Sequence, residues 1–329
     1  MRKQFAVALC ALTAGLSVPT YAGPSPSGPG PAWTILAPVP AVGSGVEGMS
    51  VASVGNSIIA ALGFDPGVGD TDTTRIYDIA HDTWLLGASA PAGSASSEGA
   101  GVAHGGLFYT IGGRAGGGPS TDILSYDPAS DTWTVLTPMS TGRAGLAVAV
   151  VGDAIYAIGG RTSTGGPNTG GTLDVVERYD IDTDTWTTVA PLLSPRSDLA
   201  AAEVGGKIYV FGGFNAAGLA VSDVDVYDPV TNTWSAAPAD MPTARGGMYA
   251  VATKGGTVYV IGGWPGFGTG LDTNEAYKVA TNTWTIGLLP MPTPRAETGA
   301  VSHGGRVYIV GGAQPAFGNS VSANEVFKP

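Results

Sequence analysis

Short apolar runs separated by glycine-rich turns recur along most of the chain, and residues 144–191 show the pattern clearly. Two runs, 147–151 (AVAVV) and 154–158 (AIYAI), flank the turn Gly152-Asp153, and the second run ends at a pair of glycines. Because nearly every position in both runs is apolar, we expect two strands that are buried on both faces. The tight turn between them predicts an antiparallel hairpin.

Two further strands complete each repeat, a third that ends in Tyr-Asp and a fourth that begins at a tryptophan. The repeat returns about every 50 residues, which is typical of a propeller. Its tryptophans are Trp33, Trp84, Trp133, Trp186, Trp234 and Trp284. Its glycine pairs begin at Gly112, Gly159, Gly212, Gly262 and Gly311. The aromatic residues between them are Tyr77, Tyr126, Tyr179, Tyr227, Tyr277 and Phe327.

Glycine pair, Tyr-Asp and tryptophan in this order resemble the kelch repeat, over about nine-tenths of the chain. The resemblance implies an all-β, six-bladed propeller. Trp33 and its neighbours match a fourth strand, whereas the last repeat stops at Phe327 before any fourth strand. We therefore expect the strand at Trp33 to complete the last blade and remove the free edges. The first repeat is degenerate, with Leu62-Gly63-Phe64 in place of the glycine pair.

The first 22 residues have the features of an export signal, with a basic start, an apolar stretch and small residues before Ala22. Cleavage after Ala22 would leave a Gly/Pro/Ser linker at 23–31 and a propeller at 32–329. It would also remove Cys10, the single cysteine. We expect a monomer in the periplasm or the medium, without membrane insertion.

The chain carries a formal net charge of −11, and removal of Arg2 and Lys3 with the leader leaves 13 basic against 26 acidic residues. Nucleic acid is excluded as a partner, because its binding depends on neutralising phosphates with Lys and Arg. The three histidines fall in short turns, so we expect no His-based triad, metal site or cofactor. The Asp70/Asp72 and Asp223/Asp225 pairs have the alternation that calcium accepts, but we interpret them as solvated loop acids.

The two faces of the predicted propeller differ in their loops. First-to-second turns are short and uniform on one face, whereas the second-to-third loops on the other face are long and dissimilar, and varied loops commonly carry binding sites. Four arginines occupy one repeat position just before the first strand, and two more follow glycine pairs. These six are Arg143, Arg196, Arg245, Arg295, Arg114 and Arg161.

Because first strands line the axis, we expect the six arginines to form a positive funnel for carboxylates at the long-loop end of the channel. In kelch propellers that capture acidic peptides, arginines at the start of the first strand contact the ligand, which the resemblance implies for Arg143 and Arg295. Val46 and Ser96 interrupt the ring in two blades. An alternative is that the arginines pair with nearby acids, namely Glu98, Asp198 and Glu297.

Aromatic residues after the glycine pairs are further candidates: Phe64, Phe214, Trp264, Phe267 and Phe317. Exposed rings there could stack on sugars or anchor a peptide, and the alternative is that they pack their own loops. The leading hypothesis is a binding module for an acidic peptide or acidic glycan. One alternative is a sugar-active enzyme that resembles kelch sialic-acid mutarotases, with Glu98 and Glu297 in proton transfer. Another is a structural cell-surface protein.

Overall fold

The computed structural model describes residues 30–163, 171–236, 238–266, 270–314 and 319–329. The compact unit from Pro31 to Pro329 consists of six four-stranded antiparallel sheets, which we number as blades 1 to 6. Blades 1 to 3 are β2(Ser50–Val54), β3(Ser57–Ala61), β6(Thr74–Asp78), β7(Thr83–Leu86); β8(Ala100–His104), β9(Leu107–Ile111), β12(Ile123–Asp127), β13(Thr132–Val135); and β14(Ala147–Val151), β15(Ala154–Ile158), β16(Val176–Asp180), β17(Thr185–Thr188).

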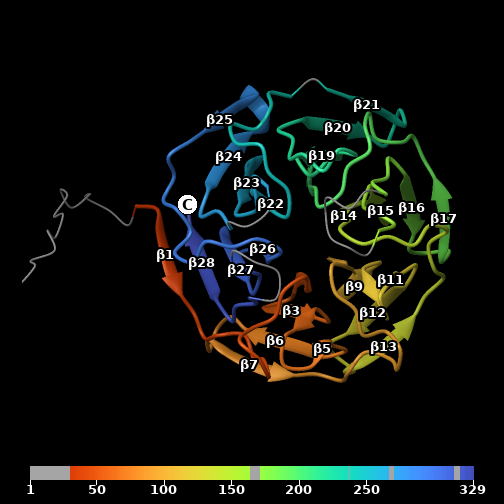
Figure 1. Cartoon of the computed structure of the whole chain (residues 1–329), viewed down its shortest axis with the longest axis vertical. Coiled ribbons are helices and arrows are strands. Elements are labelled where there is room, and N and C mark those ends of the chain that lie inside the picture. The colour runs from red at the N-terminus through yellow and green to blue at the C-terminus, as the bar shows by residue number, and fades with distance from the viewer. Residues whose placement is uncertain (1–29, 164–170, 237, 267–269, 315–318) are drawn as a thin grey trace, which may run out of the picture. The chain divides into compact units, whose positions relative to one another are not determined.

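Blades 4 to 6 are β18(Ala200–Val204), β19(Lys207–Phe211), β20(Val224–Asp228), β21(Thr233–Ser235); β22(Tyr249–Thr253), β23(Thr257–Ile261), β24(Asn274–Lys278), β25(Thr283–Thr285); and β26(Gly299–His303), β27(Arg306–Val310), β28(Asn324–Lys328), β1(Ala32–Ile35). Figure 1 shows the blades arranged in a ring. The predicted all-β, six-bladed architecture is confirmed.

The ring closes as the sequence predicts. β1 pairs antiparallel with β28, in the register Ala32↔Lys328 to Ile35↔Glu325. In Figure 1 the red β1 lies beside the blue β28. Blade 6 therefore combines strands from both ends of the described chain, which leaves no blade with three strands. The expected leader and all but the last two residues of the expected linker lie outside the described residues.

A repeated hydrogen-bond pattern joins each blade to its neighbour near the outer strands. In blade 3, the Tyr179 hydroxyl donates to Asp184 (2.7 Å), and the Asp184 carboxylate also accepts the backbone N–H of Thr137 from the preceding connection. The indole of Trp186 donates to the Thr137 carbonyl (2.7 Å). Asp82, Asp131, Asn232 and Asn282 play the part of Asp184 in blades 1, 2, 4 and 5.

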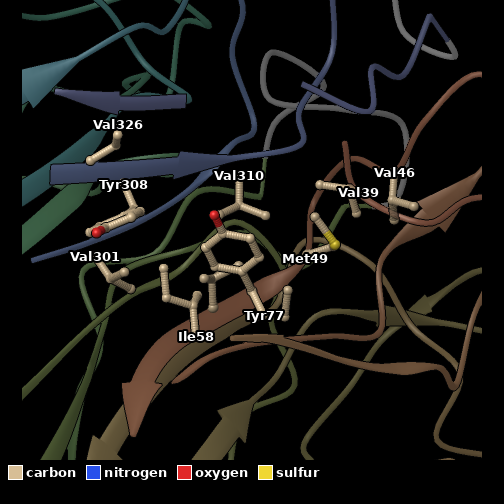
Figure 2. Close-up of a cluster of buried hydrophobic side chains, with 11 residues drawn as sticks. Val39, Val46, Met49, Ile58, Tyr77, Val301, Tyr308, Val310 and Val326 are labelled. Carbon is tan, nitrogen blue, oxygen red and sulfur yellow. The ribbon is translucent and has the colours of Figure 1, made fainter. Parts of the chain in front are cut away.

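The hydrophobic core lies between neighbouring blades. Figure 2 shows one cluster, in which Met49, Ile58 and Tyr77 of blade 1 pack near Tyr308 and Val310 of blade 6. All of these side chains are buried, and burial of an aliphatic side chain of this size stabilises the fold by about 1.5–3 kcal/mol. The side-by-side packing explains why both inner strands of a blade are almost wholly apolar.

The strand order creates two unlike faces. The short-turn face carries the turns of two or three residues between first and second strands, such as Gly152-Asp153. The long-loop face carries the second-to-third loops and the connections between blades. Two of its loops form small hairpins, β4(Phe64–Asp65) with β5(Gly69–Asp70) and β10(Arg114–Ala115) with β11(Gly118–Pro119). Among the described residues, no helix is long and apolar enough to cross a bilayer.

Candidate functional site: an acidic channel on the propeller axis

The first strands of all six blades line a central cavity of about 340 Å³. Most of its wall consists of small residues, such as Gly101, Ala201, Ala250 and Ala300. Small side chains leave space at the axis, where six strands converge. Tyr249 is the aromatic residue in this wall.

A ring of six residues surrounds the axis at the long-loop end of the cavity. In each of them the backbone N–H donates to the carbonyl of its counterpart in the preceding blade, over 2.7–3.0 Å, so the ring is closed by hydrogen bonds. All six have φ between 49° and 62°. In blade order the ring, which we call the axial ring, alternates glycine and acid: Gly48, Glu98, Gly145, Asp198, Gly247 and Glu297.

Arg161 lies against the axial ring and contacts two of its acids. Its Nη1 lies 2.7 Å from both carboxylate oxygens of Asp198, and its Nη2 contacts Glu98. Gly145 makes room for this guanidinium, since a Cβ there would lie 2.3 Å from Arg161 Nη1. Burial alone would lower the pKa of Arg161, but the charges of Asp198 and Glu98 raise it above its ordinary value.

Among the acids of the axial ring, Glu297 is the one that Arg161 does not contact. Its side chain is 8% exposed, and its Oε1 has no hydrogen-bond partner among the described residues. Burial, followed by the charges of Glu98, Glu47 and Asp198, raises the pKa of Glu297 well above its ordinary value. Burial also raises the pKa of Glu98, with Arg161 acting in the opposite direction. The axial site therefore holds more carboxyl groups than its guanidinium groups pair with.

The expected funnel of arginines requires a correction. Arg143, Arg196, Arg245 and Arg295 are 0% exposed, and none of them lines the cavity. Each forms an ion pair with an acid on the third strand of its own blade, and the partners are Glu177, Asp225, Glu275 and Glu325. These guanidinium groups hold a blade together and do not face a ligand.

The geometry of blade 6 gives the physical reason. Nη1 of Arg295 lies 2.7 Å from Glu325 Oε2, and its Nε donates to the Gly311 carbonyl at 2.8 Å. The side chain thus turns into the blade, where a carboxylate and a backbone carbonyl satisfy its donors. The alternative prediction, that these four arginines form local ion pairs, is correct. Their partners, however, are not the predicted Glu98, Asp198 and Glu297.

The sequence contained a signal for these pairs. The two blades that lack the arginine, with Val46 and Ser96 in its place, also lack the acid, since Arg75 and Leu124 occupy its position. Arginine and acid are thus present together in four blades and absent together in two. Glu47 and Tyr249, which also contribute to the axial site, carried no comparable signal.

The other predicted residues lie on the long-loop side of the propeller, and those that the structure describes are buried or partly buried. Arg161 is 1% exposed, and Arg114, at 28%, lies 3.7 Å from Glu98. Phe214 and Trp264 are 1% and 3% exposed and pack in one cluster with Ala296 and Ala313 of the blade 6 repeat, so neither ring is available to a ligand at the surface. Phe64 is partly buried. Phe267 and Phe317 lie outside the described residues.

Charge is distributed differently from the expectation. Outside the buried arginines, most basic residues lie near the short-turn face: Lys207, Lys254, Lys278, Arg306 and Lys328. The long-loop face carries one aspartate per blade just before the third strand in five blades: Asp72, Asp122, Asp174, Asp223 and Asp272. No ion pair involves these five within the described part of the chain.

The described residues contain no group of three or more His, Cys, Asp or Glu residues arranged to hold a metal ion.

A closed ring of six four-stranded blades around an axial channel defines a six-bladed β-propeller. Family models match two segments, the Kelch motif over residues 96–140 and the KLHDC2/KLHL20/DRC7 Kelch-repeats domain over residues 164–312. Together with the relatives described below, these matches show that the chain belongs to the kelch-repeat family, whose propellers mediate protein interactions.

The relatives agree with this assignment. Kelch-like protein 25 of Xenopus tropicalis is 33% identical over 165 residues, which cover 49% of this chain and 28% of the relative. Kelch-like protein 23 of Homo sapiens is 30% identical over 229 residues, covering 57% and 41%. The chain thus spans less than half the length of these relatives. The solved structure titled "Structure of YjhT" superposes with a TM-score of 0.74 at 17% identity, covering 88% of this chain and 95% of the other, which shows a shared fold.

Proposed function

We propose that this propeller is an extracytoplasmic protein-interaction module whose long-loop face binds a basic segment of a partner protein. Export rests on the leader-like first 22 residues. The single observation that carries the binding surface is the set of five aspartates on that face, one in each of blades 1 to 5, none of which forms an ion pair within the described part of the chain. An acidic surface favours basic partners, and it increases their association rate.

Exposed apolar side chains on the same face support a protein partner. Val42, Leu193 and Leu289 in the connections between blades are 75%, 54% and 46% exposed. Val68 and Leu219 in the second-to-third loops are 61% and 63% exposed. Scattered apolar groups surrounded by polar residues are common in transient protein interfaces.

An acidic peptide or glycan has less support as the ligand. Its binding would need exposed guanidinium groups, and four of the six candidate arginines are completely buried in ion pairs. The sugar-active alternative is weakened for a related reason, because Arg161 already contacts both Asp198 and Glu98. A mutarotase of the expected kind would need such an arginine free to hold its substrate.

A peptide array with basic, neutral and acidic sequences tests the proposal. The wild type should prefer basic peptides, and the double variant Asp223→Asn/Asp272→Asn should lose about tenfold in affinity, because two exposed charges leave the face. The matched control Asp153→Asn/Asp182→Asn removes two exposed charges away from that face and should bind as the wild type does. Preference for acidic peptides, or equal losses in both double variants, would refute the proposed surface.

A further inference from the structure

The end of the axial cavity nearest the long-loop face holds more carboxylates than its arginines neutralise. Glu98, Asp198 and Glu297 meet there, and Arg161 contacts the first two. Within the described residues Glu297 forms no ion pair with Arg161, whose guanidinium contacts Glu98 and Asp198 instead, and the Oε1 of Glu297 lacks a hydrogen-bond partner. A buried carboxylate without a partner is costly, because burial removes the water that stabilises its charge. A bound cation would remove that cost.

The cavity leads away from these carboxylates toward the short-turn face. Asp198 and Glu297 are only 8% exposed, whereas lining residues nearer the turns, such as Ala103, Glu203 and Ser302, are partly exposed. At the opposite end, Arg161 and Trp264 lie against the axial ring, since a Cβ on Gly145 would lie 2.3 Å from Arg161 Nη1 and a Cβ on Gly247 3.7 Å from the ring of Trp264, and Phe214 packs in one cluster with Trp264. A small molecule would therefore enter from the short-turn face and meet the carboxylates at the far end of the cavity.

We propose that the axial carboxylates bind a small organic cation, with an ammonium or guanidinium group at Glu297 and an apolar stem along the channel wall. The cavity of about 340 Å³ is within the range of small-molecule sites. The cationic end would complete the hydrogen bonds of Glu297, and the stem would contact the alanines and glycines of the first strands. This site is separate from the partner-binding face and extends beyond the proposed function.

The chemistry of the wall favours an organic cation over a metal ion. Most wall side chains are those of alanine, glycine and valine, which offer no oxygen ligands, and the described residues contain no cluster with metal-binding geometry. Tyr249 adds an aromatic ring, which can attract a cation across its face. Burial, together with the charges of Glu297 and Asp198, raises the pKa of Tyr249, so its hydroxyl stays protonated and uncharged.

Calorimetric or NMR titrations with four small probes test the site. The cations are n-butylammonium and n-butylguanidinium, the neutral probe is n-butanol, and the anion is butyrate. We expect the cations to bind at least about tenfold more tightly than butanol, and butyrate not to bind, because only a cation gains the charge-assisted hydrogen bond. Equal binding of butylammonium and butanol, or no binding of either cation, would overturn the proposal.

Two variants locate the binding. Glu297→Gln should weaken butylammonium binding at least about tenfold, while Asp182→Asn, which makes the same charge change at an exposed turn, should leave it unchanged. Equal effects of both variants would show that only the overall charge matters and would refute the site. Ala103→Trp keeps every carboxylate and fills the channel, so it should abolish binding of the cations. Undiminished binding in a folded Ala103→Trp protein would contradict entry along the channel.

Discussion

Arginine meets carboxylate in two places in this propeller, with different outcomes. Inside blades 3 to 6, one buried arginine faces one buried acid, as in Arg245 and Glu275 at 2.6 Å. On the axis, Arg161 serves both Glu98 and Asp198, and Glu297 remains without a hydrogen bond to its Oε1. Balanced pairs stabilise a blade and expose no charge. The unbalanced group leaves a carboxyl without a cationic partner next to a cavity, which is the feature that a ligand can use.

The comparison shows why repeat position alone is a poor guide to function. The four arginines share a position, a periodicity and a fold context with residues that bind ligands in kelch propellers that capture acidic peptides. Their donors nevertheless point into the blade, because an acid two strands away accepts them. Whether a charged residue faces a ligand depends on whether the fold already supplies its partner.

The largest effect is expected when one partner of a balanced ion pair is removed. Arg245→Met leaves Glu275 buried without a cation and should lower the free energy of unfolding by about 3–5 kcal/mol. The double variant Arg245→Met/Glu275→Leu removes both charges and should regain most of that stability. Denaturant unfolding measures both. A single variant as stable as the wild type would show that the pair has no structural role.

A smaller effect tests the packing of Arg161 in the axial ring. Gly145→Ala places a Cβ against the guanidinium at a φ of +58° and should cost about 1–3 kcal/mol. Gly247→Ala has a similar φ of +62°, but its Cβ would lie 3.6 Å from the nearest atom, so the loss should be about 1 kcal/mol. Thermal or denaturant unfolding compares the two, and equal losses would indicate that Arg161 does not constrain Gly145.

The smallest effect concerns the pH dependence of stability. The pKa of Glu297 is raised in the folded protein, so between its ordinary and its raised pKa the folded state binds more protons than the unfolded state. This contribution to stability is complete below the ordinary pKa of glutamate and is lost as the pH rises through the folded value. Glu297→Gln should therefore gain stability relative to the wild type from acidic to alkaline pH, measured by unfolding at several pH values. The Asp182→Asn control should show no such gain, and parallel curves for Glu297→Gln and the wild type would exclude a raised pKa.

Much of the architecture could be predicted from the sequence because it repeats. The apolar runs at 147–151 and 154–158 coincide with β14 and β15, and the unmatched fourth strand at Trp33 pairs with β28 as expected. Apolar runs and turn residues act over a few neighbouring positions, so the sequence shows them directly. Because the pattern recurs with a period near 50 residues in six copies, one irregular copy does not hide it. The degenerate first repeat still forms a complete blade.

The site could be predicted only in part. The sequence correctly indicated that Glu98 and Glu297 lie near the axis. The expected arginine lining of the channel was wrong, because acids and no arginines line the cavity. Only the tertiary structure decides which oxygen accepts each guanidinium donor, because each arginine lies just before the first strand of its blade and its acid lies on the third strand, about 30 residues later. The alternation of glycine and acid in the axial ring was visible in the sequence, yet its meaning depends on six blades converging on one axis, where backbone hydrogen bonds bring Glu98, Asp198 and Glu297 together.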